Sequence, residues 1–147
     1  MANTLGIIAV TSNKDRTPII DGENVLMNGK HVSDYNDKTS YRELNYTFWG
    51  TKKENNRSNL NVSTTAAALK AALWGTVTNE VINLTVIAKG ETDKALSITL
   101  SVPVESISWG VGVKGEAANS YVYIYNGERS PMRYKVSHTL AEIVALV

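Results

Sequence analysis

A fourteen-residue pattern occurs twice in this chain and constrains its fold more than any other feature. Residues 60–73 read LNVSTTAAALKAAL, and residues 134–147 read YKVSHTLAEIVALV. The copies lie 74 residues apart in a chain of 147 and share five identical positions. Each copy combines a short strand pattern, Ser and Thr residues suited to capping a helix, and an apolar helix pattern. The chain is therefore predicted to use one structural unit twice.

The residues before each copy support the same interpretation. An aromatic strand pattern, NYTFWG, precedes the polar segment TKKENNRSN in the first half, and SYVYIYNG precedes ERSPMR in the second. We expect an α+β, β-dominated fold with internally duplicated strand–turn–strand–helix units, antiparallel sheets and two short helices. The halves would be residues 1–75 and 76–147, packed as one compact unit. Chance is the alternative, because Ala, Ser, Thr and Val are common residues.

Other strand signals lie outside the repeated pattern. Residues 4–11 form a short apolar run, and residues 81–88 and 95–102 are separated by a polar loop, which predicts a long hairpin. The second of these strands alternates apolar and hydroxyl residues and should be half-buried. Asn28-Gly29 is typical of a two-residue turn, so a hairpin is expected between residues 25–27 and 31–32.

Both helices carry capping signals and an apolar stripe. Ser63 or Thr65 can cap the first helix, and Gly75 lies just past its end. Thr139 and Glu142 can form a capping box at the second helix. The residues expected to be buried are Ala66, Leu69 and Leu73 in the first helix, and Leu140, Ile143, Val144 and Val147 in the second.

Composition limits the class of protein. Hydrophobic residues make up 43% and charged residues 20%, which is typical of a globular chain. The absence of cysteine excludes disulfides and thiol chemistry. The net charge of +1 does not favour nucleic acid or an anionic membrane as a partner. The start of the chain does not resemble a secretory signal and no apolar run could span a bilayer, so we expect a soluble protein made in a cytoplasm.

The sequence offers no catalytic, cofactor-binding or metal-binding set of residues. Gly110, Gly112 and Gly115 form a literal GxGxxG, but an aromatic strand follows where a dinucleotide site needs a helix, so a bent strand and turn are expected. His31 and His138 are the only histidines and should have surface or capping roles. We therefore expect no cofactor and no enzymatic activity.

Two polar turns and one aromatic strand are the candidate interaction sites. These features can contact phosphate or bases, or form solvated turns and a packed sheet face, but Tyr is also enriched at protein interfaces. We predict a protein interface. Its residues are Lys52, Lys53 and Arg57 in the first turn, Arg129 in the second, and Tyr121, Tyr123 and Tyr125 on one face of the strand between them.

The C-terminal segment resembles a known small module. Residues 121–147, YVYIYNGERSPMRYKVSHTLAEIVALV, combine a strand, an Asn-Gly turn, a strand ending in Tyr-x-Val, a Ser/Thr cap and an apolar helix. This segment is similar to small flagellar proteins of the FlbD type and to many short virion proteins of tailed phages. The whole chain resembles phage structural proteins in being short, cysteine-free, β-rich and internally repeated. The resemblance implies a capsid-associated, decoration or tail protein and no catalytic residue.

These observations lead to one functional hypothesis and one alternative. The hypothesis is a non-enzymatic structural protein of a bacteriophage virion, made in the host cytoplasm and located in the virion. Its partners would be other virion structural proteins in a homo- or hetero-oligomeric assembly, with no membrane and no nucleic acid. The alternative is a small binding or regulatory module, for which nucleic acid is one candidate ligand.

Overall fold

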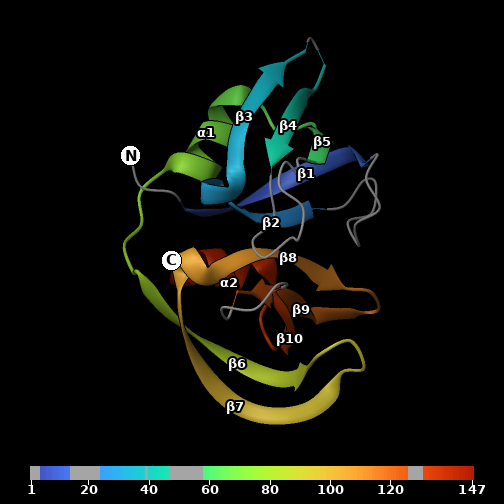
Figure 1. Cartoon of the computed structure of the whole chain (residues 1–147), viewed down its shortest axis with the longest axis vertical. Helices are drawn as coiled ribbons and strands as arrows, with labels where there is room; N and C mark the ends of the chain where they lie inside the picture. Colours follow the sequence, from blue (N-terminus) through green and yellow to red (C-terminus); the bar gives the residue numbers. More distant parts are fainter. Residues whose placement is uncertain (1–3, 14–23, 39, 47–57, 126–130) are drawn as a thin grey trace.

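The computed structural model describes residues 4–13, 24–38, 40–46, 58–125 and 131–147. Within these residues, ten antiparallel strands form one sheet and two short α-helices pack against it, as the β-dominated prediction requires (Figure 1). The elements of the first half are β1 (Leu5–Asn13), β2 (Asn24–Asn28), the 3-10 helix η1 (Gly29–His31), β3 (Val32–Asp37), β4 (Arg42–Tyr46), β5 (Ser58–Val62) and α1 (Ala66–Trp74). Those of the second half are β6 (Val81–Lys89), β7 (Lys94–Pro103), η2 (Val104–Ser106), β8 (Ile107–Val113), β9 (Glu116–Ile124), β10 (Met132–Val136) and α2 (Leu140–Leu146).

The strand order of the sheet contains the same arrangement twice. The order is β3-β4-β5-β1-β2-β8-β9-β10-β6-β7, so five strands of the first half lie beside the corresponding five of the second. One pairing, between β2 and β8, joins the two sets. Among the described strands, β3 and β7 are therefore the outer ones, and Figure 1 shows them in the upper and lower parts of the molecule.

The registers of corresponding strand pairs also agree. In the first half Val10 lies opposite Val62, and the register then shifts by one residue along β1. In the second half Val86 lies opposite Val136, with the same kind of shift along β6. The β3–β4 and β8–β9 pairs each skip one residue near the start of β3 or β8, which is Ser33 or Ser108.

The turn from the last strand to the helix has the same hydrogen bond in both halves. The Ser63 N–H donates to the Ala9 carbonyl at 2.9 Å, and the Ser137 N–H donates to the Thr85 carbonyl at 3.0 Å. Ala9 lies in β1 and Thr85 in β6, which occupy corresponding positions in the strand order. The turn before each helix is thereby tied to the first strand of its own half.

The helix starts confirm the predicted caps. The Thr65 side chain accepts a hydrogen bond from the Ala68 N–H at 3.3 Å. Thr139 and Glu142 form the predicted capping box, with distances of 3.1 and 2.9 Å. Such caps matter because helices of this length are marginal without packing and satisfied ends. The helix residues that become fully buried are Leu69 and Leu73 in α1 and Ile143 in α2.

Two apolar core clusters fill the molecule, and each contains side chains from both halves. The first cluster contains Ile8 and Val10 of β1, Val25 and Met27 of β2, and the buried apolar residues of β3, β4, β5 and α1, together with Trp109 and Val111 from β8. The second contains the buried apolar residues of β9, β10 and α2 together with Leu5 and Leu26 from the first half. Its other members are Ile82, Leu84 and Val86 of β6, Val102 of β7, Val104 of η2 and Ile107 of β8. Because alternate residues of a strand point to opposite faces, β2 and β8 contribute to both clusters. The β2–β8 pairing is therefore buried on both sides.

The hairpin predicted at Asn28-Gly29 is wrong. β2 and β3 do not pair, and η1 connects them instead. The Asn28 side chain accepts from the Lys30 N–H at 2.9 Å and donates to the Ile107 carbonyl at 2.7 Å. A Cβ atom at position 29 would lie 1.8 Å from the Leu73 carbonyl oxygen. Glycine is thus required by the close approach of α1 rather than by the positive φ that a primed turn needs.

Candidate functional site

The structure describes three of the seven predicted interface residues. Tyr121 and Tyr123 lie on one face of β9 and alternate with buried residues, as predicted, and Tyr125 follows the end of the strand. All three are half-buried. The other four, Lys52, Lys53, Arg57 and Arg129, lie outside the described residues.

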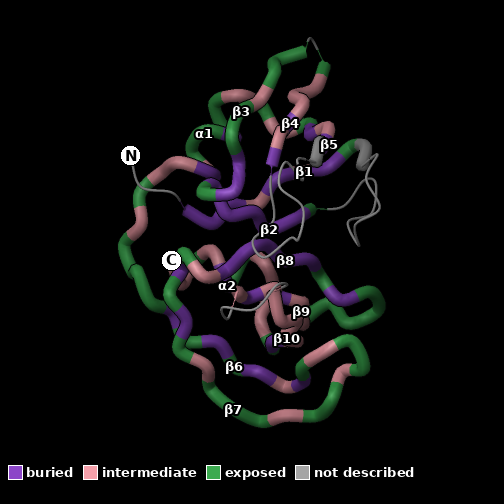
Figure 2. Tube along the Cα trace, viewed as in Figure 1, coloured by how far each residue is buried: buried purple, intermediate pink, exposed green. Residues whose placement is uncertain are grey.

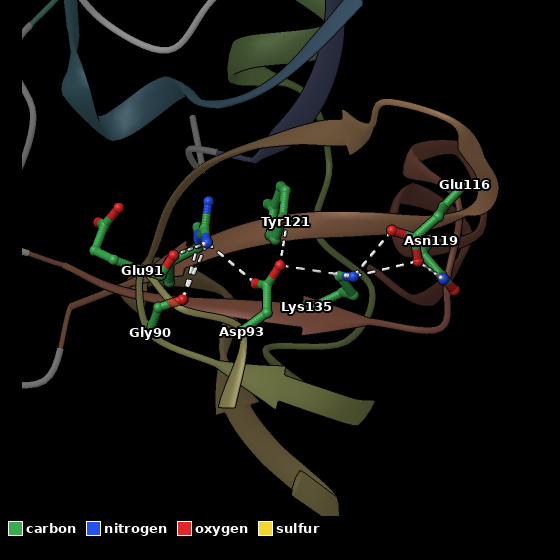
Figure 3. A network of polar contacts seen from close by, with 8 residues as sticks. Gly90, Glu91, Asp93, Glu116, Asn119, Tyr121 and Lys135 are labelled. Atoms are coloured by element: carbon green, nitrogen blue, oxygen red, sulfur yellow. Dashed lines mark hydrogen bonds and ion pairs between the residues drawn. The ribbon is translucent and has the colours of Figure 1, made fainter. Parts of the chain in front are cut away.

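Tyr121 belongs to a polar cluster that joins β9 and β10 to the β6–β7 turn. We define this cluster as Tyr121, Asp93, Arg133, Lys135 and Glu116 (Figure 3). The Tyr121 hydroxyl donates to the Asp93 carboxylate at 2.8 Å. The Arg133 guanidinium lies over the Tyr121 ring, 4.0 Å from its centre, and pairs with Asp93 at 3.1 Å. Lys135 pairs with Glu116 at 3.0 Å and reaches Asp93 at 3.8 Å.

The Arg133 side chain also holds the β6–β7 turn by hydrogen bonds to backbone carbonyls of that turn. Its guanidinium donates to the Gly90 carbonyl at 3.1 and 3.3 Å and to the Glu91 carbonyl at 2.9 Å. The turn needs this support because Gly90 and Asp93 both have positive φ angles, 79° and 51°, and the second is unusual for a residue with a side chain. The polar cluster therefore has a clear structural role.

The contacts of the polar cluster shift the pKa values of three of its members. A hydrogen bond from Lys135, followed by one from Asn119, lowers the pKa of Glu116. The hydrogen bond to Glu116 raises the pKa of Lys135. Burial, followed by the hydrogen bond to Asp93, raises the pKa of Tyr121. Hydrogen bonding and burial thus favour the charged forms of Glu116 and Lys135 and the neutral form of Tyr121, which is what a structural network of ion pairs requires.

Tyr123 packs inside the molecule. Its ring stacks on Trp109 with 4.1 Å between ring centres and 7° between planes. Both Tyr121 and Tyr123 pack against the first core cluster. Burial raises the pKa of Tyr123. Tyr121 and Tyr123, from the second half, therefore pack against a core cluster that consists mostly of first-half residues.

The two histidines and the three glycines of the GxGxxG pattern lie in parts of the fold where their roles are structural. His31 is buried, with 7% of its surface exposed, so its predicted surface role is wrong. Burial, helped by Lys30, lowers its pKa to about 4. His138 accepts from the Thr85 N–H through Nε2 at 3.1 Å. Gly110 and Gly112 lie in β8 and Gly115 in the turn after it, as the bent-strand interpretation predicted.

The feature that sequence reasoning missed is the outer strand β7. Its apolar residues Leu96, Ile98, Leu100 and Val102 should form the buried face of a half-buried strand. Val102 is buried as predicted, but Ile98 is 42% exposed and the other two are only partly buried. In the corresponding strand β2, the side chains of Val25, Leu26 and Met27 are each 0% exposed. Figure 2 shows the contrast, with β2 mostly purple and β7 mostly green and pink. The lack of any charged residue in 95–102 was the available signal.

A hollow among the described residues lies where the halves meet. It has a volume of about 250 Å³ and lies between β1, α1 and α2. Its lining is mostly apolar and includes Gly6, Ala72, Val144 and the hydroxyl-bearing Thr4 and Thr76. No described carboxylate, histidine or cation lines it, so it offers no group for acid–base chemistry.

The comparisons with known proteins leave the geometry as the basis for any functional argument. No family model, curated protein or solved structure matches this chain. Among the described residues, no group of three or more histidine, aspartate or glutamate side chains could hold a metal ion. In that same part of the chain, no helix is long and apolar enough to cross a membrane.

Proposed function

We propose that this chain is a non-enzymatic structural protein of a bacteriophage virion that acts by protein–protein assembly, as a capsid-associated, decoration or tail component. The observation that carries the proposal is the pairing of β2 with β8, which joins two five-stranded sets into one sheet. This pairing resembles an interface between two subunits, because it is the one described strand pairing that joins the two sets. A protein built from such an interface is suited to repeating it with neighbours.

The proposal includes an internal duplication. Element order, strand order, register shifts and the hydrogen bond before each helix recur with an offset of 74 to 78 residues, and these recurrences support the duplication. The first unit would be residues 1–75 and the second 76–147, with the division between α1 and β6. The core clusters support one compact molecule, because each contains buried side chains from the other half.

Assembly through sheet edges is supported by what the β2–β8 pairing buries. Val25, Leu26 and Met27 of β2 lie opposite Val111, Gly110 and Trp109 of β8. The three β2 side chains are each 0% exposed. Burial of one such side chain contributes about 1.5–3 kcal/mol. Strand pairing with apolar burial on both faces is therefore a contact that this chain already makes within one molecule.

A nucleic-acid-binding module is the alternative, and the polar cluster argues against it. Arg133 and Lys135 are the described cations beside the tyrosines, and Asp93 and Glu116 neutralise them. Binding driven by phosphate contacts requires unneutralised cations and weakens steeply with salt. Titration with mixed-sequence DNA at several salt concentrations separates the two functions, since the assembly proposal predicts no salt-dependent binding at the polar cluster.

The proposed function is tested by mass spectrometry of purified particles from the source phage. We expect this chain among the virion proteins at a fixed ratio to a major structural protein. The two polar turns remain the proposed contact residues for other virion proteins, so charge reversal at Lys52 and Lys53 should leave folding intact and reduce incorporation. Absence of the chain from purified particles would contradict the proposed function, as would a measurable turnover by the isolated protein.

A further inference from the structure

We propose that β7 is a dimerisation edge, at which the β7 strands of two copies of this chain pair antiparallel and extend the sheet across a two-fold axis. The first observation is the contrast between corresponding strands. β2 is covered along its outer edge by β8, whereas β7 occupies the same place in the second half and is the last described strand of the sheet. Its half-exposed apolar side chains are those that a paired neighbour would cover.

The apolar side chains of β7 continue the second core cluster. Leu100 lies opposite Leu84 and Ile98 opposite Val86 on β6, and both β6 residues are fully buried. Leu96 and Leu100 pack against the second core cluster. The core therefore extends to the sheet edge, where Ile98 is 42% exposed. Outer strands of soluble sheets ordinarily carry charges or proline to prevent such pairing. β7 has them only at its two ends, Lys94 and Pro103, and the eight residues between carry neither.

The sequence of β7 is self-complementary. Residues 96–102 read LSITLSV, with apolar and hydroxyl residues in strict alternation. An antiparallel pair centred on Thr99 places Ile98 of each copy opposite Leu100 of the other and Ser97 opposite Ser101. Apolar side chains then meet on one face and hydroxyls on the other, and such cross-strand pairs stabilise sheets. An isologous two-fold contact needs this self-complementarity.

The other outer strand does not suit the role of partner. Superposing the β2–β8 register on a β7–β3 pair would place Asp34 and Asn36 where β8 has Trp109 and Val111. Asp34 is exposed and hydrogen-bonded to Asn45, so its carboxylate would have to be buried against Val102. Burying a carboxylate without a charged partner is costly. The acidic β3 edge thus opposes a head-to-tail chain of copies, and the assembly closes as a dimer.

Cysteine cross-linking tests the register, because the natural chain contains no cysteine. Thr99→Cys places two thiols across the two-fold axis, and mild oxidation should give a covalent dimer at micromolar protein concentrations. Asn36→Cys on the β3 edge is the matched control and should migrate as a monomer on non-reducing gels. Mixing the two variants should give only the Thr99→Cys dimer. A mixed cross-linked product in high yield would contradict the proposal and favour the head-to-tail pairing.

A charge on the apolar face tests the contact without relying on oxidation. Ile98→Lys should shift the sedimentation-velocity mass from dimer to monomer and leave the circular dichroism spectrum unchanged. Val81→Lys is the matched control, since Val81 is 57% exposed but lies on β6, and it should remain dimeric. A natural protein that stays monomeric up to about 100 µM would overturn the proposal. The virion assignment is separate: a monomer found in particles contradicts only the dimer, and a dimer absent from particles contradicts only the proposed function.

Discussion

At the scale of single residues, the packing of η1 against α1 depends on Gly29. A Cβ atom there would overlap the Leu73 carbonyl oxygen at 1.8 Å, whereas a Cβ at Gly112 in β8 meets no atom within 4 Å. The Cβ atom would meet only backbone atoms of Leu73, so the helix must move for a side chain to fit. Gly29 is thus a requirement of the helix position.

The paired substitutions Gly29→Ala and Gly112→Ala test this requirement. We expect Gly29→Ala to lower the free energy of unfolding by about 1–3 kcal/mol or more, the usual cost of overpacking. Gly112→Ala should be neutral or stabilise slightly, because alanine loses less backbone entropy than glycine on folding. Urea unfolding followed by circular dichroism measures both. Equal effects of the two substitutions would contradict the close approach of α1 to η1.

His31 should make stability depend on pH. Burial lowers its folded-state pKa to about 4, below the unfolded value of 6.5, so the unfolded state binds the proton more readily between these values. Stability is therefore lost as pH falls from about 6.5 to 4, with a slope of at most about 1.4 kcal/mol per pH unit. Comparing the natural protein with His31→Asn isolates this contribution from carboxylate titration. Identical pH profiles would show that His31 is not buried as described.

At the scale of elements, the two helices provide matched tests of equivalence. Leu69 in α1 and Ile143 in α2 are each 0% exposed and follow their N-cap threonine by four residues. Leu69→Ala and Ile143→Ala should each destabilise the protein by about 2–4 kcal/mol, because both leave a cavity in a core cluster. Thermal unfolding measures the pair. A loss confined to one variant would contradict the equivalent positions of the helices.

The elements also show which patterns the sequence could predict. Cap residues, the β6–β7 hairpin and the bent strand at Gly110 were predictable because their signals act within a few residues. The structure at Asn28-Gly29 was not predictable from local signals. There a 3-10 helix begins instead of a hairpin turn, and glycine is required because the Leu73 carbonyl, distant in sequence, lies close to it. Alternation in residues 95–102 predicts a strand but does not say which strand covers it.

The candidate site was predictable only in part for the same reason. The alternation of Tyr121 and Tyr123 with buried residues follows from strand geometry. The partners of these tyrosines, Trp109 and the Asp93 carboxylate, come from other strands and turns, so their contacts depend on long-range pairing. The open edge at β7 depends on the order of all the strands, which no local pattern specifies.

At the scale of the whole molecule, one contact type explains both the fold and the proposed assembly. Within the chain, β2 pairs with β8 and buries apolar residues on both faces of the sheet. Between chains, β7 would pair with its own copy and cover Ile98 and its apolar neighbours. The acidic β3 strand closes the opposite end of the sheet. The chain would then act as one half of a continuous two-fold sheet within a larger particle.

Hydrogen–deuterium exchange of the backbone amides tests this account most directly. We predict that the outward-facing amides of β7 exchange more slowly as protein concentration rises from about 1 to 100 µM, while those of β2 stay protected and those of β3 exchange quickly throughout. Ile98→Lys should abolish the concentration dependence of β7. Rapid exchange of β7 at every concentration, or concentration-dependent protection of β3 instead, would contradict the account.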